Sequence, residues 1–115
     1  MLEDVSISAL HAALNGLAAR QRAISDDIAN VNTPYYRAKS VAFEGGLRQA
    51  LASGADPMQT TPTTSVSGAP VGLTYSNVDI NAETVSSVNT QLAYDLALRA
   101  TGDRFTLLRT AVKGA

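Results

Sequence analysis

The sequence predicts a mostly α fold in which long N- and C-terminal helices form an antiparallel α-helical hairpin or coiled coil. Three observations lead to this prediction. Apolar side chains recur at spacings of three and four residues near both ends of the chain. A Ser-, Thr- and Pro-rich middle separates these two patterns, and its composition is typical of an extended or partly disordered segment that could add a short β element. Each stripe needs cover from another element, which favours pairing of the two helices.

Residues 1–32 are predicted to form the N-terminal helix. Asp4 or Ser6 could cap its start, because their side-chain oxygens can accept from the first free N–H groups. Pro34 lacks an N–H and disfavours the α region for the residue before it, so we expect the helix to end near Asn32. Gln21 takes the one polar position of a heptad-type seam. The apolar members of that seam are Ile7, Leu10, Leu14, Leu17, Ile24, Ile28 and Val31.

Residues 33–52 are predicted to form a turn followed by a short extended or helical segment. The turn contains aromatic and polar side chains together with Pro34. Leu47 and Leu51 lie one helical turn apart, which indicates a weak helix over residues 45–52.

Residues 53–78 are predicted to form a variable, low-complexity loop. Three prolines and many Ser, Thr and Gly residues leave too little apolar surface to offset the entropy of ordering. Val71, Leu73 and Tyr75 alternate with small or polar residues, so this part could form a strand if another strand offers an edge.

Residues 79–115 are predicted to form the C-terminal helix, with Asn81 as its N-cap and Glu83 at the positive end of the helix dipole. Gly102 weakens the helix and could mark a bend. The apolar face is broad, which is typical of a helix with more than one neighbour. It comprises Val85, Val88, Leu92 and Leu96, beside a second row of Tyr94, Leu98, Phe105, Leu108 and Val112. We expect Leu92, Leu96, Phe105 and Leu108 to carry most of the packing in the hairpin.

Composition restricts the classes of function. The 115 residues have room for one domain at most, and much of the 45% apolar content is alanine, so a self-sufficient core would be thin. The formal net charge of −1 and the absence of charge runs give no electrostatic footprint for nucleic acid. The chain has no cysteine, which excludes disulfides and thiolate metal sites. We expect no membrane span and no cleavable signal peptide.

The sequence also argues against an enzyme. His11 has no acidic partner nearby in sequence. The adjacent carboxylates Asp26 and Asp27 would point in different directions from a helix, as would the pair in residues 3–4, so neither makes an acid–base dyad. Gly45 and Gly46 lack the strand and helix that frame a phosphate-binding loop. No ligands cluster for a metal. We therefore expect no catalytic residue, no cofactor and no metal.

The segment from residue 25 to residue 37 carries a resemblance. It resembles the N-terminal signature of the flagellar rod and hook axial protein family, of the form A-x-N-I-A-N-x-x-T-P-G-Y-K/R. Two departures from that signature matter: Asp27 stands where the family usually has asparagine, and Tyr35 where it usually has glycine. Because tyrosine disfavours positive φ, we expect a different turn type at Pro34–Tyr35. The matching residues are Ile28, Ala29, Asn30, Thr33, Pro34, Tyr36 and Arg37.

A second match lies at the start of the C-terminal helix. Residues 77–83 resemble the N-x-V-D-x-x-x-E opening of that helix in axial proteins, and residues 91–109 are similar to the helix of a proximal rod protein. The short length and the lack of a large central β domain also suit a proximal rod member. The resemblance covers residues 1–43 and 77–115.

The resemblance implies a structural subunit of the flagellar basal-body rod, the drive shaft that crosses the periplasm. Such a subunit is exported without a cleavable signal peptide through the flagellar type III apparatus and polymerises through its terminal helices. Its partners would be copies of itself, other proximal rod proteins and the basal-body adaptor, with no nucleic acid and no direct membrane span. Two alternatives stay open: a related proximal rod subunit, and a non-flagellar secreted or adaptor-type helical hairpin.

Overall fold

The computed structural model describes residues 2–114 and is mostly helical, as predicted, with long helices at both ends and one small sheet. The molecule is elongated, with extents of 63 × 26 × 14 Å. Within the described residues, no helix combines the length and the apolar character that crossing a membrane requires. In chain order the elements are α1 (Leu2–Ala29), β1 (Lys39–Ala42), α2 (Glu44–Ser53), the 3-10 helix η1 (Pro57–Gln59), β2 (Thr63–Val66) and α3 (Ile80–Val112).

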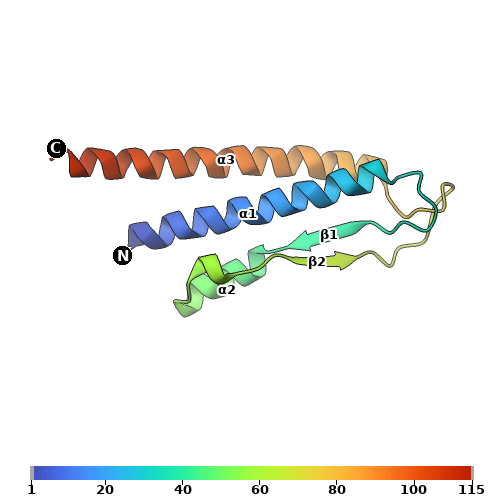
Figure 1. Ribbon diagram of the computed structural model, residues 1–115, viewed down its shortest axis with the longest axis horizontal. Helices are drawn as coiled ribbons and strands as arrows, with labels where there is room; N and C mark the ends of the chain where they lie inside the picture. Colours follow the sequence, from blue (N-terminus) through green and yellow to red (C-terminus); the bar gives the residue numbers. More distant parts are fainter. Residues whose placement is uncertain (1, 115) are drawn as a thin grey trace.

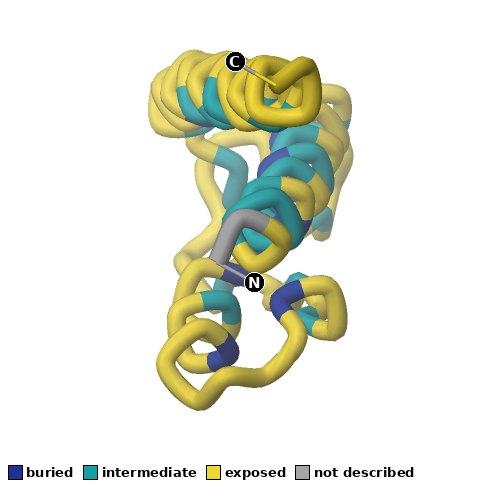
Figure 2. The backbone as a smooth tube through the Cα atoms, turned by 90° about the vertical axis from the view of Figure 1, so that its left-hand side faces the viewer, coloured by how far each residue is buried: buried dark blue, intermediate teal, exposed yellow. Residues whose placement is uncertain are grey.

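Three layers stack on one another, and α1 is the middle layer (Figure 1). Helix α3 lies along one side of α1 in the opposite direction, so the two ends of the chain lie at the same end of the molecule. The two-stranded β1–β2 sheet and α2 cover the other side of α1, as the end-on view in Figure 2 also shows. The buried residues in that view are concentrated in α1 and in the layer beneath it. A supercoiled arrangement of α1 and α3 stays a prediction.

Helix α1 begins at Leu2, so the prediction that Asp4 or Ser6 caps it was wrong: both residues lie inside the helix. The predicted end is close to the observed one. The N–H of Asn30 donates to the carbonyls of Asp26 and Asp27 at 3.1 Å, after which the chain turns toward Pro34. The polar residues of this turn therefore satisfy the last free carbonyls of α1.

Phe43 links α1 to the layer that β1, β2 and α2 form. Its ring packs on the backbone of α1 at Gly16, where an added Cβ would come within 3.0 Å of three ring atoms. The guanidinium of Arg20 lies 4.9 Å from the centre of the same ring, a cation–π distance. Arg20 also donates to the carbonyl of Val41 and to the carboxylate of Glu44. Burying Phe43 and Val41 contributes about 1.5–3 kcal/mol each.

The predicted helix over residues 45–52 is confirmed as α2, whereas the strand that Val71, Leu73 and Tyr75 could have formed is not present. The strand that pairs with β1 is β2, earlier in the chain, in an antiparallel register that places Ala42 opposite Thr63. Ser40 and Ser65 form a hydroxyl hydrogen bond of 2.9 Å across the pair. Residues 71–75 instead form a turn, and Tyr75 has a φ of 63°, which a strand does not permit.

Helix α3 begins one residue before the predicted cap. Asp79, not Asn81, is the N-cap, and its carboxylate accepts from the N–H groups of Asn81 and Ala82 at 3.1 and 3.2 Å. Glu83 lies in the first turn, as predicted. The helix continues through Gly102 without interruption.

Candidate functional site

The turn after α1 ties the end of that helix to the segment that precedes α3. Asn30 donates from its side-chain amide to the carbonyl of Asp26 at 2.8 Å, and its amide oxygen accepts from the hydroxyl of Thr33 at 3.0 Å. Tyr35 donates from its backbone N–H to the carbonyl of Tyr75 at 3.0 Å. These contacts place the signature residues at the far end of the molecule from both termini (Figure 1).

Tyr35 adopts the conformation that we expected it to avoid. Its φ is 66°, so the turn keeps the left-handed backbone that glycine usually provides, and the prediction of a different turn type was wrong. The Tyr35 side chain is 86% exposed, so the ring meets no neighbour that would oppose this backbone. The bond to Tyr75 and the packing around the turn outweigh the local cost of about 1–2 kcal/mol.

Asp27 is the centre of a buried polar cluster. Its side chain is 0% exposed, and its Oδ1 accepts from the hydroxyl of Tyr36 at 2.9 Å. The backbone N–H of Lys39 donates to both Asp27 oxygens, at 3.0 and 3.1 Å. Burial, together with the hydrogen bond to Asp27 and its charge, raises the pKa of Tyr36 to about 12. Asp27 therefore fixes the signature turn and the start of β1 to the last turn of α1.

Glu83 brings a second carboxyl group to this cluster from α3. It lines a cavity of about 160 Å³ with Ile24, Lys39 and other residues of α1 and β1. Burial, followed by the charge of Asp27 and hydrogen bonding with it, raises the pKa of Glu83 to about 7. The first turn of α3 thus places a half-buried carboxyl group in the cavity beside α1 and β1.

Ser76 and Asn77 complete the helix junction, by which we mean the contacts between the turn after α1 and the segment before α3. The sequence analysis assigned no separate role to either residue. Ser76 is almost fully buried and donates to the carbonyl of Val31 at 2.6 Å. The amide oxygen of Asn77 accepts from the N–H of Ala38 at 2.6 Å, and its amide nitrogen donates to the carbonyls of Ser67 and Ala69. Asn77 is the first residue of the second motif, over residues 77–83, and that motif could have indicated its importance. Ser76 stands in a Ser-rich stretch that gave no signal.

Arg37, the last signature residue, supports the same junction from outside. Its guanidinium donates to the carbonyl of Ala69 at 3.0 Å, alongside the bond from Asn77. The signature segment and the residues before α3 are therefore joined side chain to backbone.

Helix α3 meets α1 through small residues. Thr90 is 5% exposed, Ser87 accepts from the Gln21 side chain at 2.9 Å, and Ala93 lies beside Leu17. The prediction that Leu92 and Leu96 carry the packing between α1 and α3 was wrong, because each is 59% exposed. Leu92 is about 200° around the helix from Thr90, so it faces away from α1.

Val85, Val88, Leu92 and Leu96 form one outward stripe, which we call the outer face of α3. Their spacings of three and four residues place them on one side of the helix, and all four are exposed. Phe105 differs, because it is half exposed yet lines a cavity with Ile7 and Leu14 of α1. The outer face is thus an apolar surface of α3 that the rest of the described chain leaves exposed.

The remaining predicted packing residues divide by helix. In α1, Leu17 and Ile24 are buried, whereas Leu10, Leu14 and Ile28 are half-buried. In α3, Leu108 is half-buried, and Leu98 and Val112 are exposed. The α1 seam therefore faces inward, while most of the α3 apolar residues face solvent.

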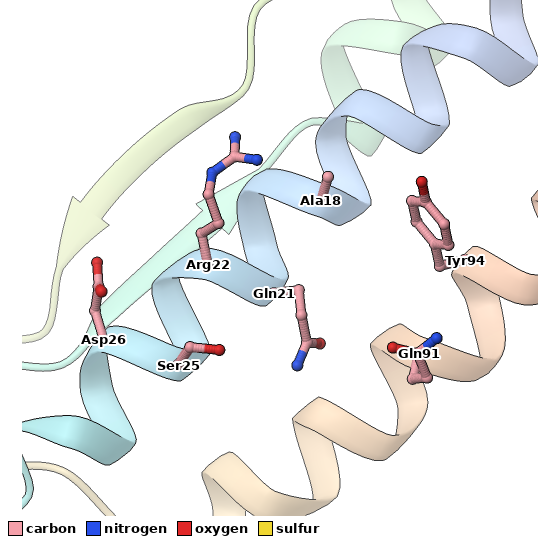
Figure 3. A pocket seen from close by; sticks show the side chains of 7 residues that line it. All are labelled: Ala18, Gln21, Arg22, Ser25, Asp26, Gln91 and Tyr94. Carbon is pink, nitrogen blue, oxygen red and sulfur yellow. The ribbon is translucent and has the colours of Figure 1, made fainter.

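A cavity of about 470 Å³ lies between the two long helices. Figure 3 shows Gln21 extending from α1 toward α3, where Gln91 and Tyr94 line the other side of this space. Gln21 Oε1 is buried without a protein hydrogen-bond partner, although its amide nitrogen is bonded to Ser87. His11 lies in a separate apolar cavity beside Thr101 and Phe105. Within residues 2–114, no three His, Cys, Asp or Glu side chains are grouped for a metal ion.

Comparison with known proteins gives one partial similarity. The chain is 40% identical over 48 residues to the flagellar basal body rod protein FlgB of Borrelia hermsii. The similar region covers 42% of this chain and 36% of that protein, so the chain spans about a third of the length of its relative. No protein-family model matches the chain. The similarity hints at a structural role in the flagellar rod.

Proposed function

We propose that this chain is a structural, non-enzymatic subunit of the bacterial flagellar basal-body rod and polymerises through its terminal helices. The observation that carries the proposal is the outer face of α3. Val85, Val88, Leu92 and Leu96 are each about 60% exposed although they form a continuous apolar stripe. The partial similarity to a rod protein supports the same role.

Burial of the outer face would drive assembly. Full burial of a Leu or Val side chain contributes about 1.5–3 kcal/mol, so covering the exposed part of these four side chains favours contact between subunits. Addition of this kind is heterologous and open-ended, since the outer face of one subunit meets a different surface of the next.

Within the rod, we assign the chain to the proximal part as a subunit of the FlgB type. Its neighbours in this proposal are copies of itself, the proximal rod proteins FlgC and FlgF, and the basal-body adaptor FliE. Delivery is through the flagellar type III export apparatus, and the site of action is the rod in the periplasm. The signature turn and the second motif support this assignment.

The ends of the helices are the parts that assembly orders in this proposal. In the C-terminal third of α3, Phe105, Leu107 and Val112 are exposed, and only Leu108 is half-buried. A dilute chain should therefore show partial helix content that rises with assembly. Circular dichroism of the dilute chain that shows its full helix content melting in one cooperative transition would contradict this part of the proposal.

A double substitution on the outer face tests the assembly. Leu92→Asp with Leu96→Asp places unpaired charges where desolvation is required, which costs several kcal/mol on burial. We expect the variant to lose incorporation into purified basal bodies and to abolish motility when it replaces the wild-type gene. The matched control is Gln49→Asp, an exposed position of α2, on the opposite side of α1 from α3.

Two readouts separate a failed fold from a failed interface. Circular dichroism of the dilute variant should match the wild type, because Leu92 and Leu96 are exposed in the single chain. Normal basal bodies containing the double variant would overturn the assignment of the outer face. Absence of the wild-type chain from purified basal bodies would overturn the rod function itself and favour the adaptor-type hairpin.

A further inference from the structure

The buried cluster between α1 and α3 has an excess of acceptors over donors. Asp27 Oδ1 already accepts from Tyr36 and Lys39, while Oδ2 accepts only the longer arm of the bond from Lys39. A carboxylate oxygen has capacity for two donors, so Oδ2 has room for one more. Glu83, in the first turn of α3, lines a cavity with Ile24, which lies one helical turn before Asp27, and with Lys39, whose N–H donates to both Asp27 oxygens.

The surrounding charges do not neutralise this pair. From α1, Asp26 adds a negative charge, and the ammonium of Lys39 on β1 is 3.8 Å from Asp26. Arg20, also on α1, lines the same cavity as Glu83 but is bonded to Glu44. From α3, Asp79 is a further carboxylate, and from the turn Tyr36 contributes only a neutral hydroxyl. Within residues 2–114, the two ion pairs are Arg20–Glu44 and Lys39–Asp26, so neither includes Glu83.

We propose that Asp27 and Glu83 share one proton, and that this proton latches the first turn of α3 to the end of α1. Glu83 takes the proton from solvent when the junction closes and donates it in a hydrogen bond to the Asp27 carboxylate. When the proton leaves, the buried Asp27 carboxylate and the half-buried Glu83 carboxylate repel each other without a cation between them, and the junction weakens. The latch is therefore a pH-sensitive device built into the helix junction.

The direction of the pH effect follows from proton counting. The raised pKa of Glu83, about 7 against an ordinary value of 4.5, means that the folded chain holds a proton that the unfolded chain has released between those values. Stability from the latch is fully present below about pH 4.5 and is lost as the pH rises through about 7. This behaviour is opposite to that of an ordinary salt-bridged glutamate.

The test is urea denaturation of the full chain, followed by circular dichroism between pH 5 and pH 8. For the wild type we expect the folding equilibrium constant to fall by a factor that approaches about tenfold per pH unit below pH 7, the slope for one linked proton. Glu83→Gln and Asp27→Asn each replace the shared proton with an amide donor, so both should remove this slope. The control is Asp103→Asn, at an exposed position on α3, which should keep it.

A second measurement does not depend on the variants folding. The side-chain carboxyl carbon of Glu83, followed by carbon-13 NMR in the wild-type chain, should titrate near pH 7, and that titration should move back toward the ordinary range in Asp27→Asn. A Glu83 titration in the ordinary range in the wild type would overturn the proposal. The proposal would also be overturned if Glu83→Gln and Asp27→Asn kept the pH dependence of the folding equilibrium constant as fully as the control Asp103→Asn.

Discussion

The N–H of Tyr35 donates to the carbonyl of Tyr75 at 3.0 Å, and both tyrosines have a left-handed backbone, with φ of 66° and 63°. Both side chains are exposed at the end of the molecule that carries the signature turn. The bond joins the turn after α1 to the turn before α3. Two non-glycine residues in this conformation mark a place where tertiary contacts hold the backbone against its local preference.

Replacing Tyr35 with glycine should stabilise the chain. Glycine removes a left-handed penalty of about 1–2 kcal/mol and adds an entropic cost of about 0.5–1 kcal/mol, so we expect a net gain of roughly 0.5–1 kcal/mol. Urea denaturation measures the change. Tyr35→Ala serves as the control, because alanine removes the ring and keeps the strained φ. An equal gain from alanine would show that the ring, and not the backbone, causes the effect.

Gly16→Ala should destabilise the contact between α1 and the layer that β1, β2 and α2 form. The new methyl group would overlap the Phe43 ring, and overpacking of this kind costs about 1–3 kcal/mol. The matched control is Gly46→Ala in α2, where an added Cβ meets nothing within 4 Å and should add up to about 1 kcal/mol of stability. Thermal denaturation of the two variants should therefore shift in opposite directions.

Glu44 should stabilise the chain above acid pH and lose this effect as the pH falls. The hydrogen bond from Arg20 lowers the pKa of Glu44 to about 2. Its contribution is present above the ordinary value of 4.5 and disappears as the pH falls toward 2. Glu44→Gln should be less stable than the wild type at pH 6, and the difference should shrink toward pH 2. A difference that stays constant with pH would exclude the ion pair as its cause.

Alanine substitutions should distinguish the inner and outer faces of the helix pair. Ile24 is 4% exposed, so Ile24→Ala should cost about 2–5 kcal/mol in the dilute chain. Leu96→Ala should change the free energy of unfolding by about 0.5 kcal/mol or less, because surface positions carry little of the fold. Urea denaturation at low concentration checks both. A large cost for Leu96→Ala in the dilute chain would mean that the outer face packs within one subunit.

The sequence by itself determined the helices and most of their ends. The spacing of apolar residues acts within a few turns, and Pro34 ends α1 by steric means, so neither requires knowledge of the rest of the chain. The short α2 followed from Leu47 and Leu51 in the same way. The sequence did not identify the N-cap of α3, because Asp79 and Asn81 are both good N-cap residues and only the path of the preceding turn selects between them.

Only the tertiary structure decided which face of α3 meets α1. Glu83 faces Ile24 and Lys39, and Ser87 is bonded to Gln21; with this rotation of α3, Thr90 and Ala97 lie on the inner side and Leu92 lies on the outer side. The helix junction imposes positive φ on Tyr35 and buries Asp27, and the edge of β1 selects β2 as its partner. Each of these outcomes depends on contacts between residues far apart in sequence, whose combined free energy exceeds the local preference that a sequence pattern reports.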